Sequence, residues 1–314
     1  MAVHRRSRAL PNIALLLLSL LWAAGVLQAD LLPDLIPNPL MPLLRQALSL
    51  GLLAIVACAL AIAHGDQWPR GRMLWSCITV GVGLFVAPAM LVSWANPWVP
   101  GLTQAALFTL TPIFTLVFEP YIGGENAPQE PSQSRMGLLA ALAAFGGALC
   151  AFHVNVPTSI QEAGGLFTVI AATACLAAAN CKAVAVAHEL DKGSIRPLAA
   201  IAAATAAILL GTASAVGNQA IWEWAAVEPA LLWAVGVEVP GLLLLFWLTR
   251  QMSATRMATR YIWAPLIAVF VGAALMQAHF MPRTWIGLLL MALGAAYLLL
   301  SPASAQEQDM LSLR

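Results

Sequence analysis

Residues 100–125 read PGLTQAALFTLTPIFTLVFEPYIGGE, an apolar segment from which the rest of the chain can be interpreted. It is long enough to cross a bilayer, because about 20 residues at a rise of 1.5 Å cover a hydrocarbon core of ~30 Å. One helical face collects a stripe of side chains, made of Gln104, Phe108, Thr111, Thr115 and Glu119. Polar groups exposed to hydrocarbon cost several kcal/mol each, so the stripe needs protein or water beside it. We therefore expect this helix to form one wall of an internal cavity.

The overall composition indicates an all-α integral membrane protein. Apolar residues make up 61% of the 314 residues and charged residues only 9%, with a mean hydropathy of +0.83. Soluble domains carry roughly 25% charged residues, so the expected surroundings are a lipid bilayer. The net charge of +1 and the absence of a basic patch give no reason to expect nucleic acid as a partner. The five cysteines lie in apolar runs without CxxC spacing, so we expect packing residues, no metal site and no cofactor.

Apolar runs separated by proline, glycine and aspartate predict ten transmembrane helices. The expected spans are residues 9–28, 42–64, 72–95, 99–122, 135–154, 165–188, 197–220, 229–250, 254–279 and 283–301. For the first span a cleaved signal peptide is the alternative, but its apolar run exceeds the usual 7–15 residues, which favours a retained helix.

The charges of the loops predict the orientation. With the N-terminus in the cytoplasm, most basic residues fall on the cytoplasmic side, whereas the outer side keeps Arg283 and, at a helix edge, Arg45. This asymmetry follows the positive-inside rule for ten spans with both termini in the cytoplasm. We expect a multi-pass protein of a bacterial-type inner (plasma) membrane.

The chain also has the pattern of an internal duplication. Pro112 and Pro265 are 153 residues apart and stand in the fourth and ninth expected spans. Five spans per half would insert the two copies in opposite orientations. We therefore expect two inverted five-helix repeats, residues 1–155 and 156–314, with a binding site near the midplane between them.

Short motifs occur in both halves of the chain. They are Leu21-Trp22, Arg45, Thr111-Pro112 before Gly124-Glu125, Ser253-Ala-Thr, Pro265, and Gly287 with Gly294. With these motifs, nearly the whole chain resembles the EamA-type transporters of the drug/metabolite transporter superfamily. The chain departs from the family pattern at Ala23, at Ala144, and at Ala278-His279, where a second glutamate is missing. The resemblance implies a secondary transporter, often an exporter, with a central cavity lined by helices one to four and six to nine.

Ionisable residues inside the spans are the candidates for mechanism, since a charge at the bilayer centre costs at least ~2.5 kcal/mol. Glu238 lies near the middle of the eighth span, beside Gly236, Pro240 and Gly241. It could carry a proton or bind an amine, so a proton is a candidate coupling ion. The alternative is a protonated glutamate that only hydrogen-bonds to a neighbouring helix.

Three further charges, Glu119, Lys182 and Arg260, lie within about two turns of the cytoplasmic ends of their spans. We expect them to form a cytoplasmic gate, in which the acid stands between two bases. The alternatives are a lysine that extends to the interface and a glutamate that is solvated at a helix end.

Cavity-lining positions complete the predicted site. Besides Glu238, they are Gln104, Thr111, Thr115, Trp22, Asn180 and Trp263. Each has a structural alternative: interhelical hydrogen bonding for the polar side chains and packing for the aromatic ones.

The sequence contains no enzyme signature: neither HExxH, GxSxG, a P-loop nor paired carboxylates at catalytic spacing. We expect a secondary transporter, not an enzyme, that exports or exchanges a small polar metabolite such as an amino acid. Lipid-carrier flipping is an alternative that a lateral opening between helices would favour. A non-transporting scaffold or an intramembrane enzyme would instead show paired charges and no cavity.

Overall fold

The computed structural model describes residues 2–30, 42–122, 135–152, 154, 156–190, 195–217, 224–277 and 280–300. These residues form helices and connecting turns, and none of them lies in a strand. The predicted Gly124-Glu125 motif falls outside the described residues, as do Ala278-His279 and both chain ends.

Among the described residues, ten helices are long and apolar enough to cross a membrane, as predicted. The first five spans are α1 (Ala2–Asp30), α2 (Pro42–Ala63), α3–η1–α4 (Arg72–Gly81, Val82–Val86, Ala87–Ala95), α5–α6 (Gly101–Phe108, Thr111–Ile122) and α7 (Arg135–Phe152). The other five are α8 (Ile160–Glu189), α9 (Arg196–Val216), α10–η3–α11 (Trp224–Trp233, Ala234–Glu238, Val239–Leu248), α12–α13 (Ala254–Ala258, Arg260–Met276) and α14 (Pro282–Leu300).

The predicted boundary of the sixth span was wrong by five residues, because α8 begins at Ile160 and not at 165. A capping box explains the earlier start. The Ser159 hydroxyl accepts a hydrogen bond from the Glu162 amide at 3.1 Å, and the Glu162 carboxylate accepts one from the Thr158 amide at 2.7 Å. The ninth span also ends early, at Met276, because Gln277 adopts the left-handed conformation with φ 52°.

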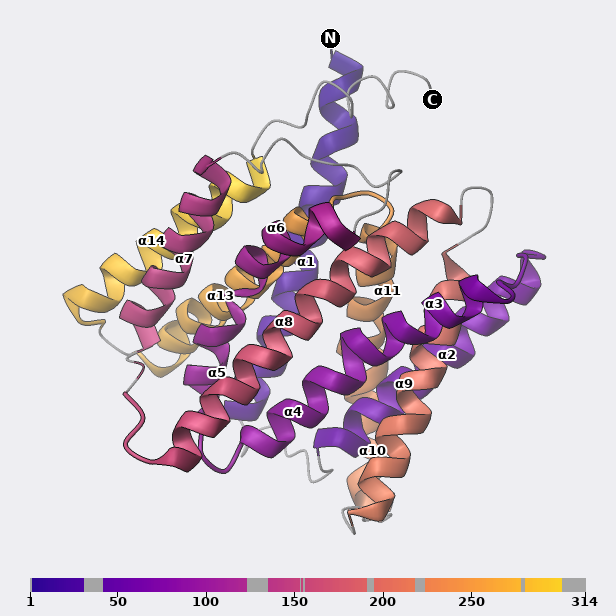
Figure 1. Ribbon diagram of the computed structural model, residues 1–314, viewed down its shortest axis with the longest axis horizontal. Coiled ribbons are helices and arrows are strands. Elements are labelled where there is room, and N and C mark those ends of the chain that lie inside the picture. Colours follow the sequence, from indigo (N-terminus) through magenta and orange to yellow (C-terminus); the bar gives the residue numbers. More distant parts are fainter. Residues whose placement is uncertain are drawn as a thin grey trace.

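Helix α8 is the centre of the bundle. Figure 1 shows it crossing the middle of the molecule, between the α7–α14 pair at one side and α2, α3 and α9 at the other. In the most apolar part of α8, 67% of the residues are buried inside the protein, against 33–50% in the other nine spans. It packs against α4 and α6, while α1 packs against α11 and α13. The frequent alanines of α8 allow this close approach because they present little side-chain volume.

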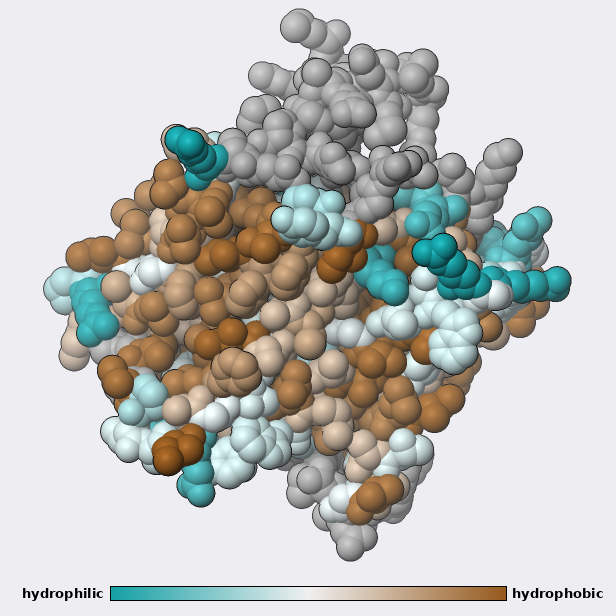
Figure 2. Space-filling model, viewed as in Figure 1, coloured by the Kyte–Doolittle hydropathy of each residue, from teal (hydrophilic) through white to brown (hydrophobic). Residues whose placement is uncertain are grey.

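The outer surface is apolar, as a lipid environment requires. Figure 2 shows brown apolar side chains over the centre of one face and teal hydrophilic side chains gathered toward its margins. Large exposed apolar residues such as Ile55, Phe167 and Leu289 belong to this surface. In a soluble protein such an extent of exposed apolar surface would mark an interaction site; here it matches ten apolar spans.

Two spans are interrupted by a turn, and at each turn a threonine hydroxyl bonds to a backbone carbonyl. Between α5 and α6 the chain makes a turn at Thr109 and Leu110, just before Pro112. Proline has no amide hydrogen for the carbonyl of Phe108, and the Thr111 hydroxyl donates to that carbonyl at 2.6 Å instead. In the ninth span the break lies at Thr259, whose hydroxyl donates to the Arg256 carbonyl at 2.7 Å. The first interruption directly precedes its central proline, whereas the second comes six residues before Pro265.

Helices α7 and α14 meet backbone to backbone through glycines. A Cβ atom added at Gly147 would lie 2.6 Å from the Gly287 carbonyl oxygen and 2.9 Å from the Met291 amide nitrogen. Neither backbone atom can move aside without separating the helices. At the adjacent Gly146 an added Cβ would meet nothing within 4 Å.

This contrast predicts opposite effects for two neighbouring substitutions. Gly147→Ala should lower the free energy of unfolding by about 1–3 kcal/mol, because the methyl group overpacks the helix contact. Gly146→Ala should be neutral or stabilising by up to ~1 kcal/mol, because alanine favours a helix. Thermal unfolding of the detergent-solubilised variants measures both effects, and equal changes would contradict the described α7–α14 contact.

Candidate functional site

The predicted polar stripe of α5–α6 is buried inside the bundle. Thr111 and Thr115 are fully buried, Gln104 is 8% exposed and Glu119 is 4% exposed. The stripe faces other helices, since α6 packs against α8 and α12, whereas Val117 on the opposite side is exposed. Protein therefore covers this face, and the predicted cavity wall stays a prediction.

Most of the stripe is occupied by local hydrogen bonds. The Gln104 side-chain amide donates to the Asn96 side chain and to the Val99 carbonyl, both at 2.8 Å. The Thr115 hydroxyl donates to the Thr111 carbonyl at 2.7 Å. Gln104 thus holds the α4–α5 connection, and both threonines bond to carbonyls of their own span.

Glu119 joins two spans at the end of the stripe. Its carboxylate accepts a hydrogen bond from the Thr255 hydroxyl, which comes from the short helix α12. Thr255 is fully buried and follows Ser253, whose hydroxyl accepts the Arg256 amide hydrogen bond and so caps α12. The contact links the α5–α6 span to the α12–α13 span through two buried side chains.

Arg260 is the largest fully buried side chain of the described residues. It stands at the first position of α13, directly after the break at Thr259. Its Nη2 donates to the Asn180 side-chain oxygen at 2.8 Å and to the Tyr261 hydroxyl at 2.9 Å, and its Nη1 donates to the Met257 carbonyl at 3.1 Å. Within the described residues no carboxylate forms an ion pair with this guanidinium.

Aromatic rings enclose the same guanidinium. Its Cζ lies 5.0 Å from the ring centroid of Trp22 and 4.6 Å from that of Tyr261, within the range of cation–π attraction. The Trp22 and Tyr261 rings are 5.4 Å apart, and Phe108 stacks on Tyr261 at 6.3 Å. Trp22 and Asn180 were both predicted as site residues, and the structure brings them to Arg260 from α1 and α8.

Two buried donors of this region, the Nε of Arg260 and the Nδ2 of Asn180, have no acceptor among the described residues. The predicted Trp263 packs instead against the apolar cluster that includes residues of α7 and α14, and its Nε1 also has no acceptor among the described residues. Buried polar groups are nearly always hydrogen-bonded. The region therefore has more donors than acceptors.

The structure gives the three predicted gate residues different surroundings. Glu119 binds Thr255, Arg260 binds Asn180, and no described ion pair joins either of them to the other or to Lys182. Lys182 is partly buried on α8, two residues after Asn180. The gate stays a prediction.

Glu238 belongs to a separate polar cluster. It lies at the end of η3, accepts a hydrogen bond from the Ser49 hydroxyl, and its Oε1 is 3.5 Å from the Nε of Arg45. The side chains of Arg45 and Glu238 are 24% and 23% exposed, so the pair is partly accessible. The sequence pattern assigned no role to Ser49 and placed Arg45 only at a helix edge on the outer side. Arg45 and Ser49 are four residues apart, about one helical turn, and this spacing was the feature of the sequence that places them on one face of α2.

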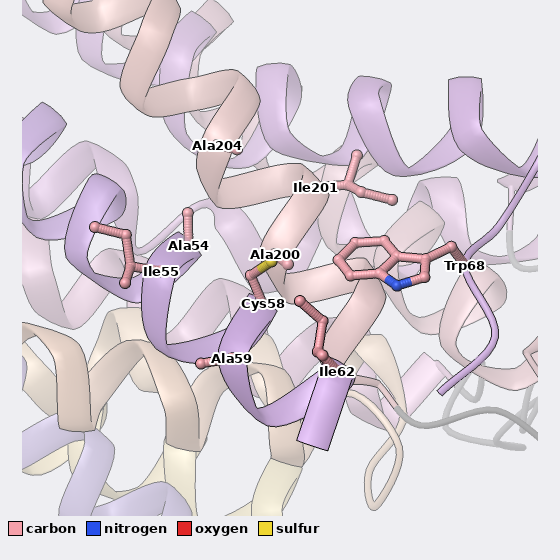
Figure 3. A pocket seen from close by; sticks show the side chains of 9 residues that line it. All are labelled: Ala54, Ile55, Cys58, Ala59, Ile62, Trp68, Ala200, Ile201 and Ala204. Carbon is pink, nitrogen blue, oxygen red and sulfur yellow. The ribbon is translucent and has the colours of Figure 1, made fainter. Parts of the chain in front are cut away.

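An open apolar groove of about 520 Å³ lies on the outer surface between α2 and α9. Figure 3 shows Trp68 at one end of it, with its indole beside Ile201 and Ile62. The lining consists of Ala54, Ile55, Cys58, Ala59, Ile62, Trp68, Ala200, Ile201 and Ala204. These residues offer an apolar lining that suits hydrocarbon chains and not a polar solute. Elsewhere, no group of three or more metal-binding side chains was found among the described residues.

The comparisons with known proteins concern the fold alone. No family model and no curated protein matches the chain. The fold is similar to that of a solved structure described as "Crystal structure of protein", with a TM-score of 0.71 and 16% sequence identity. The similarity covers 93% of this chain and 99% of that chain, so nearly all of the architecture is shared.

The Arg45–Glu238 contact generates a double-mutant prediction. Arg45→Gln and Glu238→Gln should each destabilise the protein, and their effects should be non-additive by about 0.5–3 kcal/mol, because the second substitution removes a partner that is already lost. Thermal unfolding in detergent measures this coupling. Glu238→Gln combined with Arg135→Gln, an exposed arginine on α7, should be additive. Additivity in the first pair would contradict the contact.

Proposed function

We propose that the protein is a secondary transporter of the EamA type in the drug/metabolite transporter superfamily. In this proposal it exports or exchanges a small polar metabolite, such as an amino acid, across a bacterial-type inner membrane. The observation that carries the proposal is the fully buried guanidinium of Arg260, which lies among apolar helices without a carboxylate partner in the described residues. In membrane proteins such costly charges mark the path of a substrate or an ion.

Local irregularities support the inverted repeat. The two π-helical segments, η1 (Val82–Val86) and η3 (Ala234–Glu238), occupy the third and eighth spans and are each followed by a proline, Pro88 or Pro240. The two broken spans are likewise the fourth and the ninth. Irregular turns at corresponding positions are expected when both halves descend from one unit and serve one site.

The helix pairing supports the same arrangement. Under the proposed repeat, α1 corresponds to α8 and the α5–α6 span to the α12–α13 span. When each helix is replaced by its proposed counterpart, the α1–α13 contact becomes the α8–α6 contact, and both contacts are observed. The same replacement maps the α2–α9 and α7–α14 pairs onto themselves. In this proposal both termini are cytoplasmic, and α1 is retained because Trp22 contributes to the site.

Glu238 is the proposed site for a coupling proton. Its carboxylate pairs with Arg45 and Ser49, and its partial exposure leaves a route for protonation. Protonation would remove the attraction to Arg45 and so change how α2 and the eighth span are held together. A ligand or proton can bias two states only through such a difference in interaction.

Lipid-carrier flipping is the second candidate, and the groove between α2 and α9 is the observation that favours it. Its apolar lining could hold an acyl or polyprenyl chain. A scaffold without transport is the third candidate. It offers no reason for a buried cation that is left without a counter-charge.

Transport is tested with the purified protein in proteoliposomes. These are incubated with a mixture of amino acids and organic acids, with and without a pH gradient, and uptake is read by mass spectrometry. At least one polar metabolite should accumulate above the level in protein-free liposomes, and Glu238→Gln should change its dependence on the gradient. Glu228→Gln, at an exposed glutamate of α10, serves as the charge-matched control and should match the parent. No uptake of any metabolite under either condition would contradict the transporter proposal.

The proposed gate has a separate test. Glu119→Gln weakens a charged hydrogen bond to Thr255, which should raise the cytoplasmic labelling rate of Thr115→Cys about tenfold through a population shift toward the open form. Thr255→Val removes the same bond from its other side and should act in the same direction. Unchanged labelling in both variants would show that this contact holds no gate closed.

A further inference from the structure

We infer that the cluster of Arg260, Asn180, Trp22 and Tyr261 binds the carboxylate of a small organic monoanion. The inference rests on the proposed transport function, because it names the substrate class of the proposed site. It starts from the balance of charge and hydrogen bonds around a single buried side chain.

The hydrogen bonds of Arg260 leave part of its capacity unused. A guanidinium has five N–H donors, and three hydrogen bonds are formed here, to Met257, Asn180 and Tyr261. The Nε has no acceptor among the described residues. Asn180, whose oxygen is bound to the same guanidinium, leaves its own Nδ2 without an acceptor. The two neighbouring residues thus offer donors and lack acceptors.

Charge selects the ligand further. Arg260 is fully buried and its contacts are a carbonyl, an amide, a hydroxyl and two aromatic rings, none of which carries a formal negative charge. A buried cation without a counter-charge is costly, and an anion that binds there removes this cost. One positive charge is balanced by one carboxylate. A phosphate monoester carries about −1.5 to −2 and would leave an excess of negative charge.

The aromatic rings indicate what the carboxylate is attached to. Trp22, Tyr261 and Phe108 provide apolar faces beside the charged group. A carboxylate on a short aliphatic or aromatic group satisfies both parts of the site, because its apolar part contacts the rings. An inorganic anion would pair with the charge of Arg260 but would have no apolar part to contact the rings.

A substitution at Asn180 tests the inference while Arg260 stays in place. The Asn180 Oδ1 already accepts from Arg260 at 2.8 Å, so Asn180→Asp adds a carboxylate of nearly the same shape at that position. The resident carboxylate should neutralise Arg260, stabilise the protein and exclude a carboxylate ligand. Arg260→Gln removes the charge and should weaken carboxylate binding by about 100-fold, the size of a lost charge-assisted hydrogen bond pair.

The experiment measures binding in detergent, independently of transport. Acetate, butyrate and phenylacetate are each compared with the corresponding neutral amide at constant ionic strength set by sodium chloride. Calorimetric titration gives the affinity and thermal unfolding gives the midpoint shift. At least one carboxylate should bind and stabilise the parent and the Arg135→Gln control, whereas its amide should not. Asn180→Asp and Arg260→Gln should lose the response.

Two results would overturn the inference: carboxylates that bind no better than their amides, or binding that persists in Asn180→Asp. Inorganic phosphate that binds more tightly than every carboxylate would overturn the choice of a monocarboxylate. Should Arg260→Gln fail to fold, Asn180→Asp decides alone. Uptake into proteoliposomes that survives Arg260→Gln would refute this site and leave the transporter proposal intact. Binding in detergent without any uptake would refute transport and leave the site intact.

Discussion

The cost of exposing a polar group to hydrocarbon is the constraint on which the rest of the structure depends. It explains why the polar stripe of α5–α6 faces inward while the exposed surface is apolar. It also explains why the centre of the bundle is α8, whose small side chains let the neighbouring helices approach closely enough to cover the polar groups.

Many buried polar side chains in the described residues satisfy this constraint, but several keep a polar atom without a hydrogen-bond partner, among them Arg260, Asn180 and Trp263. The hydroxyls of the broken spans bond to carbonyls within their own spans, and Glu119 accepts from Thr255. Arg260 is different, because its charge has no ionic partner among the described residues and its Nε no acceptor. This missing partner is the reason for proposing a carboxylate ligand at Arg260.

Hydropathy and helical period sufficed to predict the ten spans and the inward-facing stripe, because both depend on local sequence alone. Boundaries failed where a short-range hydrogen bond decides them, as at the capping box of Ser159. The contacts between side chains could not be predicted, for a different reason. The contacts of Glu238 with Arg45 and of Arg260 with Tyr261 depend on how helices are rotated about their own axes. A single sequence does not encode that rotation in any local pattern.

The glycine contact between α7 and α14 has a mechanical consequence. Two helices that touch through their backbones cannot slide, because each glycine fits a recess only at one register. The register of α7 and α14 is therefore fixed. In the proposed transporter, a motion that admits a solute would therefore involve the interrupted spans, where the hydroxyls of Thr109 and Thr259 bond to carbonyls at the breaks. The α7–α14 contact would then keep its register while the spans beside Arg260 move.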